Sequence, residues 1–366
     1  MLRCAWPHPQ RLLAAAVLAA ALCVLVGCQS QEKAAQQPPT TGTKESPLQP
    51  LPLPSQVKGG ASLKVAMIPK RKGMAYFNAA EKGARQAAQD LNVELLYEGP
   101  EQADDVNKQI EIIESFIVQK VDVICVSAND PKTIAPTLKK ARDAGIHVLT
   151  WDADADPQAS GREFMVDQAS PEMIGRTLVD VMAEEAGPDA QCCIISGSQT
   201  AANQNEWVKW MDKERAEKYP QMKVLDTKYS GESQEEADKI ASAFMTKYGG
   251  KLNGIFGITS VAFPGAAEAV QQAGKAGKVH VTGLSTPNEM KPLVKAGVVQ
   301  TVLLWDVDAL GYLTVVAAKA VADGALKPGA TELDAGKLGK KQVEGDRVVL
   351  GPLMRFTKDN IDQYDC

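Results

Sequence analysis

Residues 121–151 read VDVICVSANDPKTIAPTLKKARDAGIHVLTW, and this stretch decides the fold of the chain. Its two ends, Val121–Ser127 and His147–Trp151, are short apolar runs rich in β-branched residues, which predicts two strands. Between them, Thr133–Ala144 has helical spacing and stops at Gly145, where a left-handed cap costs little. A strand, a helix and a second strand predict a parallel βαβ unit, and the nearly continuous apolar character of the first strand predicts helices on both of its faces.

The same alternation runs along the rest of the chain from Leu63. Further strands are expected at Lys64–Ile68, Val93–Tyr97, Gln191–Ser196, Lys223–Tyr229, Gly254–Ile258, Val279–Leu284 and Val298–Leu304. Further helices are expected at Ala75–Leu91, Val106–Lys120, Met173–Ala186, Asn203–Lys218, Gln234–Tyr248, Pro264–Ala273 and Ala309–Ala322. Because the alternation occurs before and after a break at 156–161, we expect an α/β protein with two doubly wound parallel-sheet lobes joined by a multi-strand hinge. The N-terminal lobe is expected at 62–162 and 306–340, and the C-terminal lobe at 163–305 and 341–366.

Composition excludes several classes of function. The 366-residue chain is longer than one hydrophobic core usually supports, in agreement with two lobes. Its net charge of -5, with acidic and basic residues mixed, offers no basic surface for nucleic acid. The sequence contains no Walker loop, dinucleotide glycine pattern, nucleophile elbow or zinc spacing, and His147 and His280 lie in or beside apolar strands. We therefore expect a binding protein rather than an enzyme, with no cofactor and no metal.

The N-terminus carries the pattern of an export signal. Basic residues precede the apolar run Leu12–Val26, which is too short for a stable bilayer-spanning helix and is followed by Gly27 and Cys28. This pattern predicts a lipoprotein signal peptide at 1–27 with a lipid on Cys28, which would be the protein's only membrane contact. The alternatives are an ordinary secretory signal and an uncleaved anchor. Residues 28–61, rich in Gln, Pro and Ser, predict a disordered tether.

Candidate site residues of the first lobe follow its strands, because open parallel sheets bind ligands beyond the carboxyl ends of their strands. Lys70 follows the first strand and can donate to a ligand hydroxyl, while Tyr76 and Phe77 begin the next helix and can stack on a sugar. Trp151 and Asp152 end the fourth strand, and a carboxylate beside an aromatic ring suits the vicinal hydroxyls of a neutral sugar. A solvated basic turn is the alternative for Lys70, and an N-cap or loop carboxylate is the alternative for Asp152.

In the second lobe, Asn203 and Gln204 begin a helix after the strand Gln191–Ser196. Their amides both donate and accept, which suits a hydroxyl-rich ligand, although a polar first turn with an N-cap explains the same residues. Trp305 follows the last apolar run and either lines the cleft or packs the hinge. The acidic run at 152–156 superficially matches a calcium loop, but Pro157 stands where that loop requires a glycine, so no metal site is expected.

Several ordered motifs of the chain are similar to those of one family of receptors. They are Met67-Ile68-Pro69-Lys70, Tyr97-Glu98-Gly99-Pro100, Leu149-Thr150-Trp151-Asp152, Gln204-Asn205-Glu206-Trp207-Val208, Leu284-Ser285-Thr286-Pro287-Asn288, Leu304-Trp305-Asp306-Val307 and Phe356-Thr357-Lys358-Asp359-Asn360-Ile361. Together they resemble the type I periplasmic binding proteins of sugar ABC transporters, and more narrowly the autoinducer-2 and rhamnose receptor branch. The resemblance runs from about Leu63 to Cys366. It implies a monomeric receptor of the periplasm or cell envelope that captures a small sugar and passes it to permease and ATPase subunits.

The resemblance also bears on the ligand. Autoinducer-2 receptors hold their ligand with a lysine, an aspartate, an Asp-Gln pair, and a proline and an alanine after a second-lobe strand. The matching positions here are Lys70, Asp152 and Gln204. Asn203 replaces the aspartate of the pair, and Ile258 and Ser260 replace the proline and the alanine. A hydrogen bond to a charged group contributes roughly 1.5 to 3 kcal/mol, so we expect weak autoinducer-2 binding. A neutral monosaccharide such as rhamnose is the preferred ligand. An autoinducer-2 receptor and a sugar-sensing receptor for a signalling partner are the alternatives.

Overall fold

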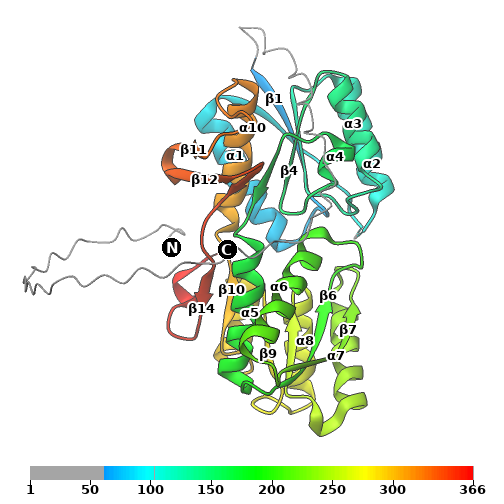
Figure 1. Cartoon of the computed structure of the whole chain (residues 1–366), viewed down its shortest axis with the longest axis vertical. Coiled ribbons are helices and arrows are strands. Elements are labelled where there is room, and N and C mark those ends of the chain that lie inside the picture. Colours follow the sequence, from blue (N-terminus) through cyan, green and yellow to red (C-terminus); the bar gives the residue numbers. More distant parts are fainter. Residues whose placement is uncertain (1–61, 103, 366) are drawn as a thin grey trace, which may run out of the picture. The chain divides into compact units, whose positions relative to one another are not determined.

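The computed structural model describes residues 62–102 and 104–365, and these residues build two α/β lobes (Figure 1). Each lobe contains a sheet whose central strands are parallel and whose faces are covered by helices. This confirms the fold class predicted from the sequence. The predicted signal segment, the predicted tether at 28–61 and Cys28 lie outside the described residues.

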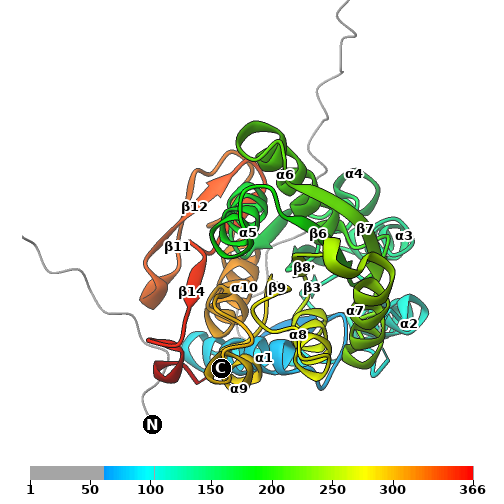
Figure 2. The same ribbon diagram turned by 90° about the horizontal axis from the view of Figure 1, so that it is seen from below.

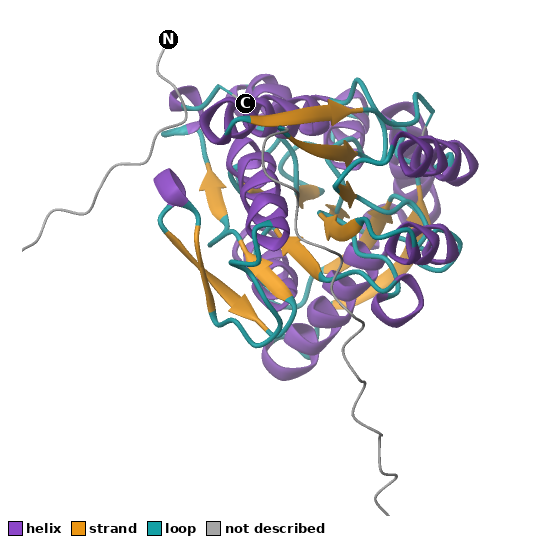
Figure 3. Cartoon of the chain, turned by 90° about the horizontal axis from the view of Figure 1, so that it is seen from above, coloured by secondary structure: helices purple, strands orange, loops and turns teal. Residues whose placement is uncertain are grey.

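The first lobe is built on an eight-stranded sheet in the order β11-β12-β13-β5-β4-β3-β1-β2. Its strands are β1 (Leu63–Ile68), β2 (Val93–Tyr97), β3 (Val123–Val126), β4 (His147–Trp151), β5 (Phe164–Asp167), β11 (Glu332–Asp334), β12 (Lys340–Glu344) and β13 (Arg347–Val349). The strands from β13 to β2 pair in parallel, whereas β12 pairs antiparallel with both of its neighbours. The antiparallel strands extend one edge of the sheet (Figure 3).

Helices cover both faces of this sheet because successive residues of a strand point to opposite sides. In β1, Val65 and Met67 pack in the cluster that contains α1 and α10, whereas Ala66 and Ile68 pack against α2 and α3. The helices of the lobe are α1 (Ala75–Leu91), α2 (Val106–Gln119), α3 (Ala135–Asp143), the short α4 (Pro157–Ser160) and α10 (Val307–Ala322). A strand buried on both faces has no polar side to expose, which explains the continuous apolar runs of the sequence.

The second lobe has a four-stranded parallel sheet in the order β7-β6-β8-β9. Its strands are β6 (Gln191–Ser196), β7 (Lys223–Tyr229), β8 (Gly254–Gly257) and β9 (His280–Gly283). Its helices are α5 (Pro171–Ala186), α6 (Ala202–Lys218), α7 (Gln234–Tyr248), α8 (Ala262–Gln272) and α9 (Pro287–Lys295). Helices α5 and α6 pack together on one side of the sheet, and α7 and α8 pack together on the other (Figure 2). Short 3-10 turns occur at Gly249–Lys251, Gly336–Leu338 and Ile361–Gln363.

The chain crosses between the lobes after β5, before α10 and after β13. The strand before α10 is β10 (Val302–Leu304), which pairs antiparallel with β14 (Met354–Phe356) beyond β13. Leu303 of β10 also forms a bridge with Leu284, so this ribbon adjoins the second sheet. The expected strand at 298–304 is therefore shorter than predicted, because Val298 instead bonds back to a carbonyl of α9. Paired crossing segments form the multi-strand hinge that the sequence predicted.

Strand pairing corrects two of the expected lobe limits. Strand β5 pairs in parallel with β4 and β13, so the first lobe extends beyond residue 162. Strands β12 and β13, at 340–349, also belong to the first sheet, whereas the expected second lobe resumed at 341. These pairings join segments that are distant in the sequence, and local hydrophobic patterns carry no information on such partners.

Helices α1 and α10 pack backbone to backbone at two glycines. A Cβ atom on Gly311 would lie 2.6 Å from the carbonyl carbon of Ala80, and one on Gly83 would lie 2.6 Å from the carbonyl carbon of Asp308. Helix α10 is buried along nearly its whole length, which explains its apolar sequence. Among the helices of residues 62–102 and 104–365, none has both the length and the apolar character needed to cross a bilayer.

Candidate ligand-binding site between the lobes

The two lobes meet around a pocket of about 420 Å³, open space at its mouth included. Its lining residues are Lys70, Met74, Tyr76, Phe77, Asp152, Asn203, Gln204, Trp207, Glu232, Ile258, Thr259, Ser260, Leu284, Leu304 and Trp305. They follow β1, β4, β7, β8, β9 and β10, end β10, or belong to the first two turns of α1 and α6. The pocket therefore lies at the carboxyl ends of strands from both sheets, where open α/β sheets bind ligands.

Lys70 lies two residues beyond β1 and is only 7% exposed, so it is not a solvated basic turn. Its ammonium nitrogen lies 3.5 Å from Oδ1 of Asn203, which belongs to the other lobe. Within the described residues, no carboxylate lies at ion-pair distance from this nitrogen. Burial raises the pKa of the Glu232 and Asp104 carboxyl groups, and the nearby charge of Lys70 partly offsets that rise. An ammonium group has three donors, so Lys70 has donors left for a ligand.

Asp152 is the first residue after β4, is buried, and has a left-handed backbone with φ of 62°. Its Oδ1 accepts hydrogen bonds from the Tyr76 hydroxyl at 2.9 Å and from Nε2 of Gln168 at 2.7 Å. Its Oδ2 accepts from the Ser127 hydroxyl at 2.7 Å. Burial and the Asp152 carboxylate raise the pKa of Tyr76 well above its ordinary value, so its hydroxyl stays a donor. The carboxylate caps no helix, and Oδ2 retains a lone pair that a ligand can use.

Asn203 and Gln204 lie in the first turn of α6, and neither is the N-cap of that helix. Asn203 donates through Nδ2 to the backbone carbonyl of Asp152 at 3.3 Å, which links the two lobes. The side chain of Gln204 is largely used within the protein. Its Oε1 accepts two hydrogen bonds from the end of β6, and its Nε2 donates to Oε1 of Glu232 at 3.0 Å. Gln204 therefore lines the pocket and also positions the Glu232 side chain.

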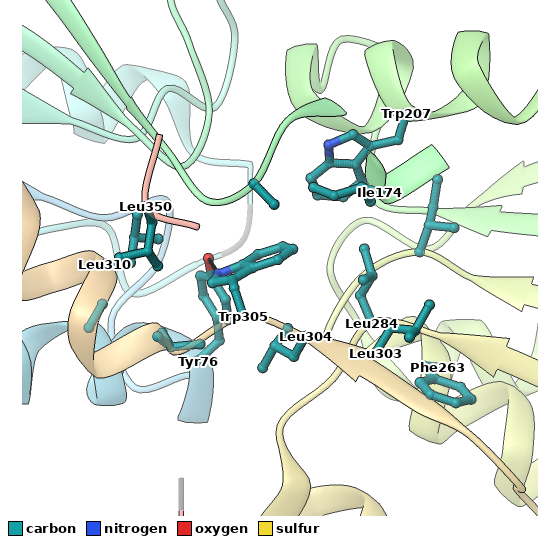
Figure 4. Close-up of a cluster of buried hydrophobic side chains, with 14 of the residues drawn as sticks. Tyr76, Ile174, Trp207, Phe263, Leu284, Leu303, Leu304, Trp305, Leu310 and Leu350 are labelled. Carbon is teal, nitrogen blue, oxygen red and sulfur yellow. Dashed lines mark hydrogen bonds between the residues drawn. The ribbon is translucent and has the colours of Figure 1, made fainter. Parts of the chain in front are cut away.

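Aromatic rings form one wall of the pocket. Trp305 lies between Tyr76 and Trp207, with ring centroids 6.0 Å from each (Figure 4). Its indole N–H donates to the Tyr76 hydroxyl at 3.0 Å, so Trp305, Tyr76 and Asp152 form one hydrogen-bonded chain. Phe77 lines the pocket beside Tyr76, and their rings pack edge to face. Trp305 therefore both lines the cleft and packs the hinge crossing.

Trp151 lies elsewhere than expected. It does not line the pocket, because its ring is fully buried behind Phe77 at a centroid distance of 5.7 Å. Its indole N–H donates to the carbonyl of Ile68 at 3.3 Å. Trp151 is still part of β4, where it points with Leu149 into the core beneath α1 and α10, and only Asp152 lies past the end of the strand. Strand alternation thus makes Trp151 a supporting residue.

The loop after β8 contributes the two positions at which the chain departs from the autoinducer-2 pattern. Ile258 and Ser260 both line the pocket. Ile258 is fully buried, and the Ser260 carbonyl accepts a hydrogen bond from the Ser285 hydroxyl at 2.7 Å. This side of the pocket is therefore less polar than the side formed by Lys70 and Asp152.

Glu232 is not among the ligand-binding residues that the sequence predicts. It follows β7, is 9% exposed, and lines the pocket from the second lobe. The available signal was its position just after the expected strand Lys223–Tyr229, which makes it a strand-end residue like Lys70 and Asp152. Its neighbours Gly231 and Ser233 gave the segment the composition of an ordinary polar turn.

The acidic run at 152–156 is used within the fold. Asp154 pairs with the buried Arg162 at 2.7 Å, and Asp156 accepts hydrogen bonds from backbone N–H groups that begin α4. In the part of the chain that the structure describes, no cluster of three His, Cys, Asp or Glu side chains could hold a metal ion. Cys125, Cys192 and Cys193 are buried free thiols in strands, where they act as small apolar residues.

Two parallel-sheet lobes around a polar pocket at a hinge define the class of two-lobed binding proteins. The chain belongs to the periplasmic binding protein domain family, whose pattern matches residues 65–326. It is 30% identical over 240 residues to the D-ribose/D-allose-binding protein of Pseudomonas aeruginosa, covering 64% of this chain and 74% of that protein.

Solved structures agree with this assignment. LsrB from Clostridium saccharobutylicum, in complex with AI-2, is 29% identical with a TM-score of 0.77, covering 83% of this chain and all of that one (100%). An ABC transporter solute binding protein from Clostridium phytofermentas, with bound L-rhamnose, is 25% identical with a TM-score of 0.77, covering 83% of this chain and 98% of that one.

Proposed function

We propose that this protein is the solute-binding component of an ABC importer and that it captures a small neutral monosaccharide, with L-rhamnose as one candidate. The observation that carries the proposal is the pocket itself, in which a lysine, carboxylates and aromatic rings from both lobes converge. Carboxylates and amides can bind sugar hydroxyls while rings cover an apolar sugar face. Relatives that bind D-ribose or L-rhamnose support a sugar as the ligand. The protein would bind and release its solute without altering it, so we propose no enzymatic activity.

Lobe closure would couple capture to delivery. A ligand held by Lys70 and Asp152 on one lobe and by Asn203 on the other contacts both lobes only when they are closed. It therefore stabilises the closed form relative to the open one. The closed protein would then dock on the permease, and the ATPase subunits would drive release of the sugar inward. We propose Phe77, Gln204, Ile258, Ser260 and Trp305 as the other ligand-binding residues.

Autoinducer-2 is the second candidate ligand, because LsrB in complex with AI-2 is among the similar structures. Asn203 here is an amide in the place of that branch's aspartate, and its Oδ1 already accepts from the backbone N–H of Gln204 at 2.9 Å. An oxygen engaged in this way is a weaker acceptor for the ligand than a carboxylate. We therefore expect weaker binding of autoinducer-2 than of a neutral sugar.

We propose further that the protein acts as a monomer in the periplasm or cell envelope and is held there by a lipid on Cys28. The family's location supports an extracytoplasmic site, and the sequence at 1–28 supports the lipid. Mass spectrometry of the protein from membranes should find an acylated N-terminal Cys28, and Cys28→Ser should release the protein from the membrane fraction. An unmodified chain that begins elsewhere would contradict the anchor and leave the receptor role intact.

A thermal-shift screen tests the central proposal. The panel contains L-rhamnose, D-ribose, D-allose, D-fructose, D-arabinose and autoinducer-2. A ligand that binds only the folded protein adds about 2.7 kcal/mol of stability at a hundredfold excess over its Kd, so a true ligand raises the melting temperature in a concentration-dependent way. Recovery of the bound sugar unchanged after long incubation would support a receptor over an enzyme. A panel in which only autoinducer-2 gives a shift would overturn the monosaccharide proposal in favour of the signal receptor.

A further inference from the structure

The backbone conformation at Glu232 is fixed by the surrounding structure. Its backbone lies in the left-handed region with φ of 53°, directly after Gly231 with φ of 61°. The backbone N–H groups of Ser230 and Gly231 donate to the carbonyls of Ser196 and Gly197, at 2.8 and 2.9 Å, and so tie this loop to the end of β6. Non-glycine residues are uncommon in the left-handed region and persist where the surrounding structure holds them.

Space for the Glu232 carboxyl group is provided by a glycine. A Cβ atom on residue 197 would lie 2.8 Å from Cδ of Glu232, which is closer than real Cβ atoms come to a neighbour. The Gln204 amide then orients the group by donating to its Oε1. Gly197, which has no side chain, and the Gln204 amide therefore together position the Glu232 carboxyl group.

One oxygen of Glu232 is left for a ligand. Oε1 is engaged by Gln204, whereas Oε2 has no hydrogen-bond partner among the described residues. Oε2 keeps some exposure, and Glu232 lines the pocket. The charge of Lys70 favours the ionised form of Glu232 against the effect of burial. An ionised carboxylate only accepts hydrogen bonds, so this oxygen calls for a donor on the bound solute.

We propose that Glu232 is the second charged acceptor of the ligand site and that it makes the site selective for neutral, hydroxyl-rich solutes over anionic ones. This inference rests on the proposed sugar-binding function. Asp152 on the first lobe and Glu232 on the second present two carboxylates to the pocket, against the single ammonium of Lys70. Sugar hydroxyls can donate to both carboxylates. A sugar phosphate or sugar acid would instead place a like charge beside them in a poorly solvated pocket, which is costly.

The charge balance of the site also changes the meaning of Asn203. The amide at this position removes a carboxylate from α6, but Glu232 supplies one from the loop after β7. The carboxylate thus enters the pocket from a different strand end. A solute of this protein would then present its donor group in another direction than a ligand that needs a carboxylate on α6.

Isothermal titration calorimetry on the full folded chain tests this assignment. The neutral probes are L-rhamnose and D-ribose, and the anionic probes are D-ribose 5-phosphate and D-galacturonate. Glu232→Gln keeps an acceptor oxygen but loses its charge, so it should weaken the neutral ligand about fivefold to tenfold and should narrow the preference for neutral over anionic probes. Gly197→Ala keeps the charge but displaces the carboxyl group. It should weaken neutral binding without admitting the anions.

Glu235→Gln is the matched control, because Glu235 is exposed in the first turn of α7 and its side chain is 80% accessible. This substitution should change neither the affinity for the neutral probes nor the preference for neutral over anionic probes. If the natural chain binds a neutral probe and Glu232→Gln binds it equally well, the assignment of Glu232 is wrong while the sugar-binding function stands. If the natural chain binds neither neutral probe, the function proposed for these sugars fails and the assignment falls with it. Circular dichroism of each variant checks that it is folded. If Glu232→Gln does not fold, the effect of Gly197→Ala on neutral-ligand affinity decides whether Glu232 binds the ligand.

Discussion

Replacement of Asp152 by asparagine isolates the role of its charge. Asparagine tolerates the left-handed backbone at this position, so the substitution adds little backbone strain. The carboxylate accepts from Tyr76, Gln168 and Ser127 at 2.7 to 2.9 Å. A bond to a charged group contributes about 1.5 to 3 kcal/mol, against about 0.5 to 1.5 kcal/mol for a neutral pair, so each of the three loses about 1 kcal/mol. The NH₂ group of the asparagine would also face one or more of these donor groups and could not accept a hydrogen bond from them. We expect the free energy of unfolding to fall by about 2 to 4 kcal/mol.

The same substitution should weaken the ligand found in the thermal-shift screen by about fivefold, because its hydroxyl would meet a neutral acceptor. Urea unfolding measures the first effect and isothermal titration calorimetry measures the second. Asp189→Asn is the matched control, since Asp189 is exposed and its side chain lies outside the pocket. If Asp152→Asn matched the natural chain in both measurements, the view that three buried donors hold a ligand-binding carboxylate would be refuted.

Three further predictions address packing, pH and closure. Burial raises the pKa of Glu185 to about 7 from an ordinary 4.5, so its contribution to stability is full below pH 4.5 and is lost as the pH rises through 7. Glu185→Gln should remove this loss, up to about 3 kcal/mol, and flatten the dependence of the urea midpoint on pH between 5 and 8. Gly311→Ala should destabilise the protein by at least about 1 to 3 kcal/mol in urea, because α1 and α10 must separate, whereas Gly250→Ala, with open space around it, should have little effect. Glu206 of α6 lies 3.2 Å from Arg347 of β13 in the other lobe, so Glu206→Gln should weaken ligand affinity about twofold to fivefold at low salt and have no effect at high salt. An unchanged affinity at low salt would show that this partly exposed pair does not favour closure.

Much of the first lobe could be predicted because its information is local. The strands β1 to β4 are short apolar runs separated by amphipathic helices, and the residues just beyond two of them, Lys70 and Asp152, do line the pocket. The edge strands could not be predicted in the same way. Strand β13 is three residues long and pairs with β5 far upstream. The sequence of neither segment identifies the strand with which it pairs. Lobe limits depend on such pairings, which explains why these limits were wrong while the fold class was right.

The site shows the same division between local and non-local information. The expected strand already included Trp151, and because every residue of β4 is buried, only the residue after the strand reaches the pocket. Its place after an expected strand marks Glu232 as a strand-end residue, but its partner Gln204 follows only from the sheet order, in which β7 lies beside β6. That neighbour relationship brings Glu232 next to Gln204, which begins the helix after β6.

A comparison position by position therefore misjudges the chemistry of this pocket. The amide at Asn203 suggests a site that has lost a negative charge, yet Glu232 leaves two carboxylates and one ammonium among its lining residues. On the proposed assignment of Glu232, we expect discrimination between a sugar and autoinducer-2 to depend on the direction from which the second carboxylate approaches, and less on the number of charges. This distinction is measurable, because Asn203→Asp would add a third carboxylate within reach of Lys70. If direction governs recognition, Asn203→Asp should weaken the natural sugar, because the new carboxylate would pair with the Lys70 ammonium that the sugar uses. It should improve autoinducer-2 only when combined with Glu232→Gln.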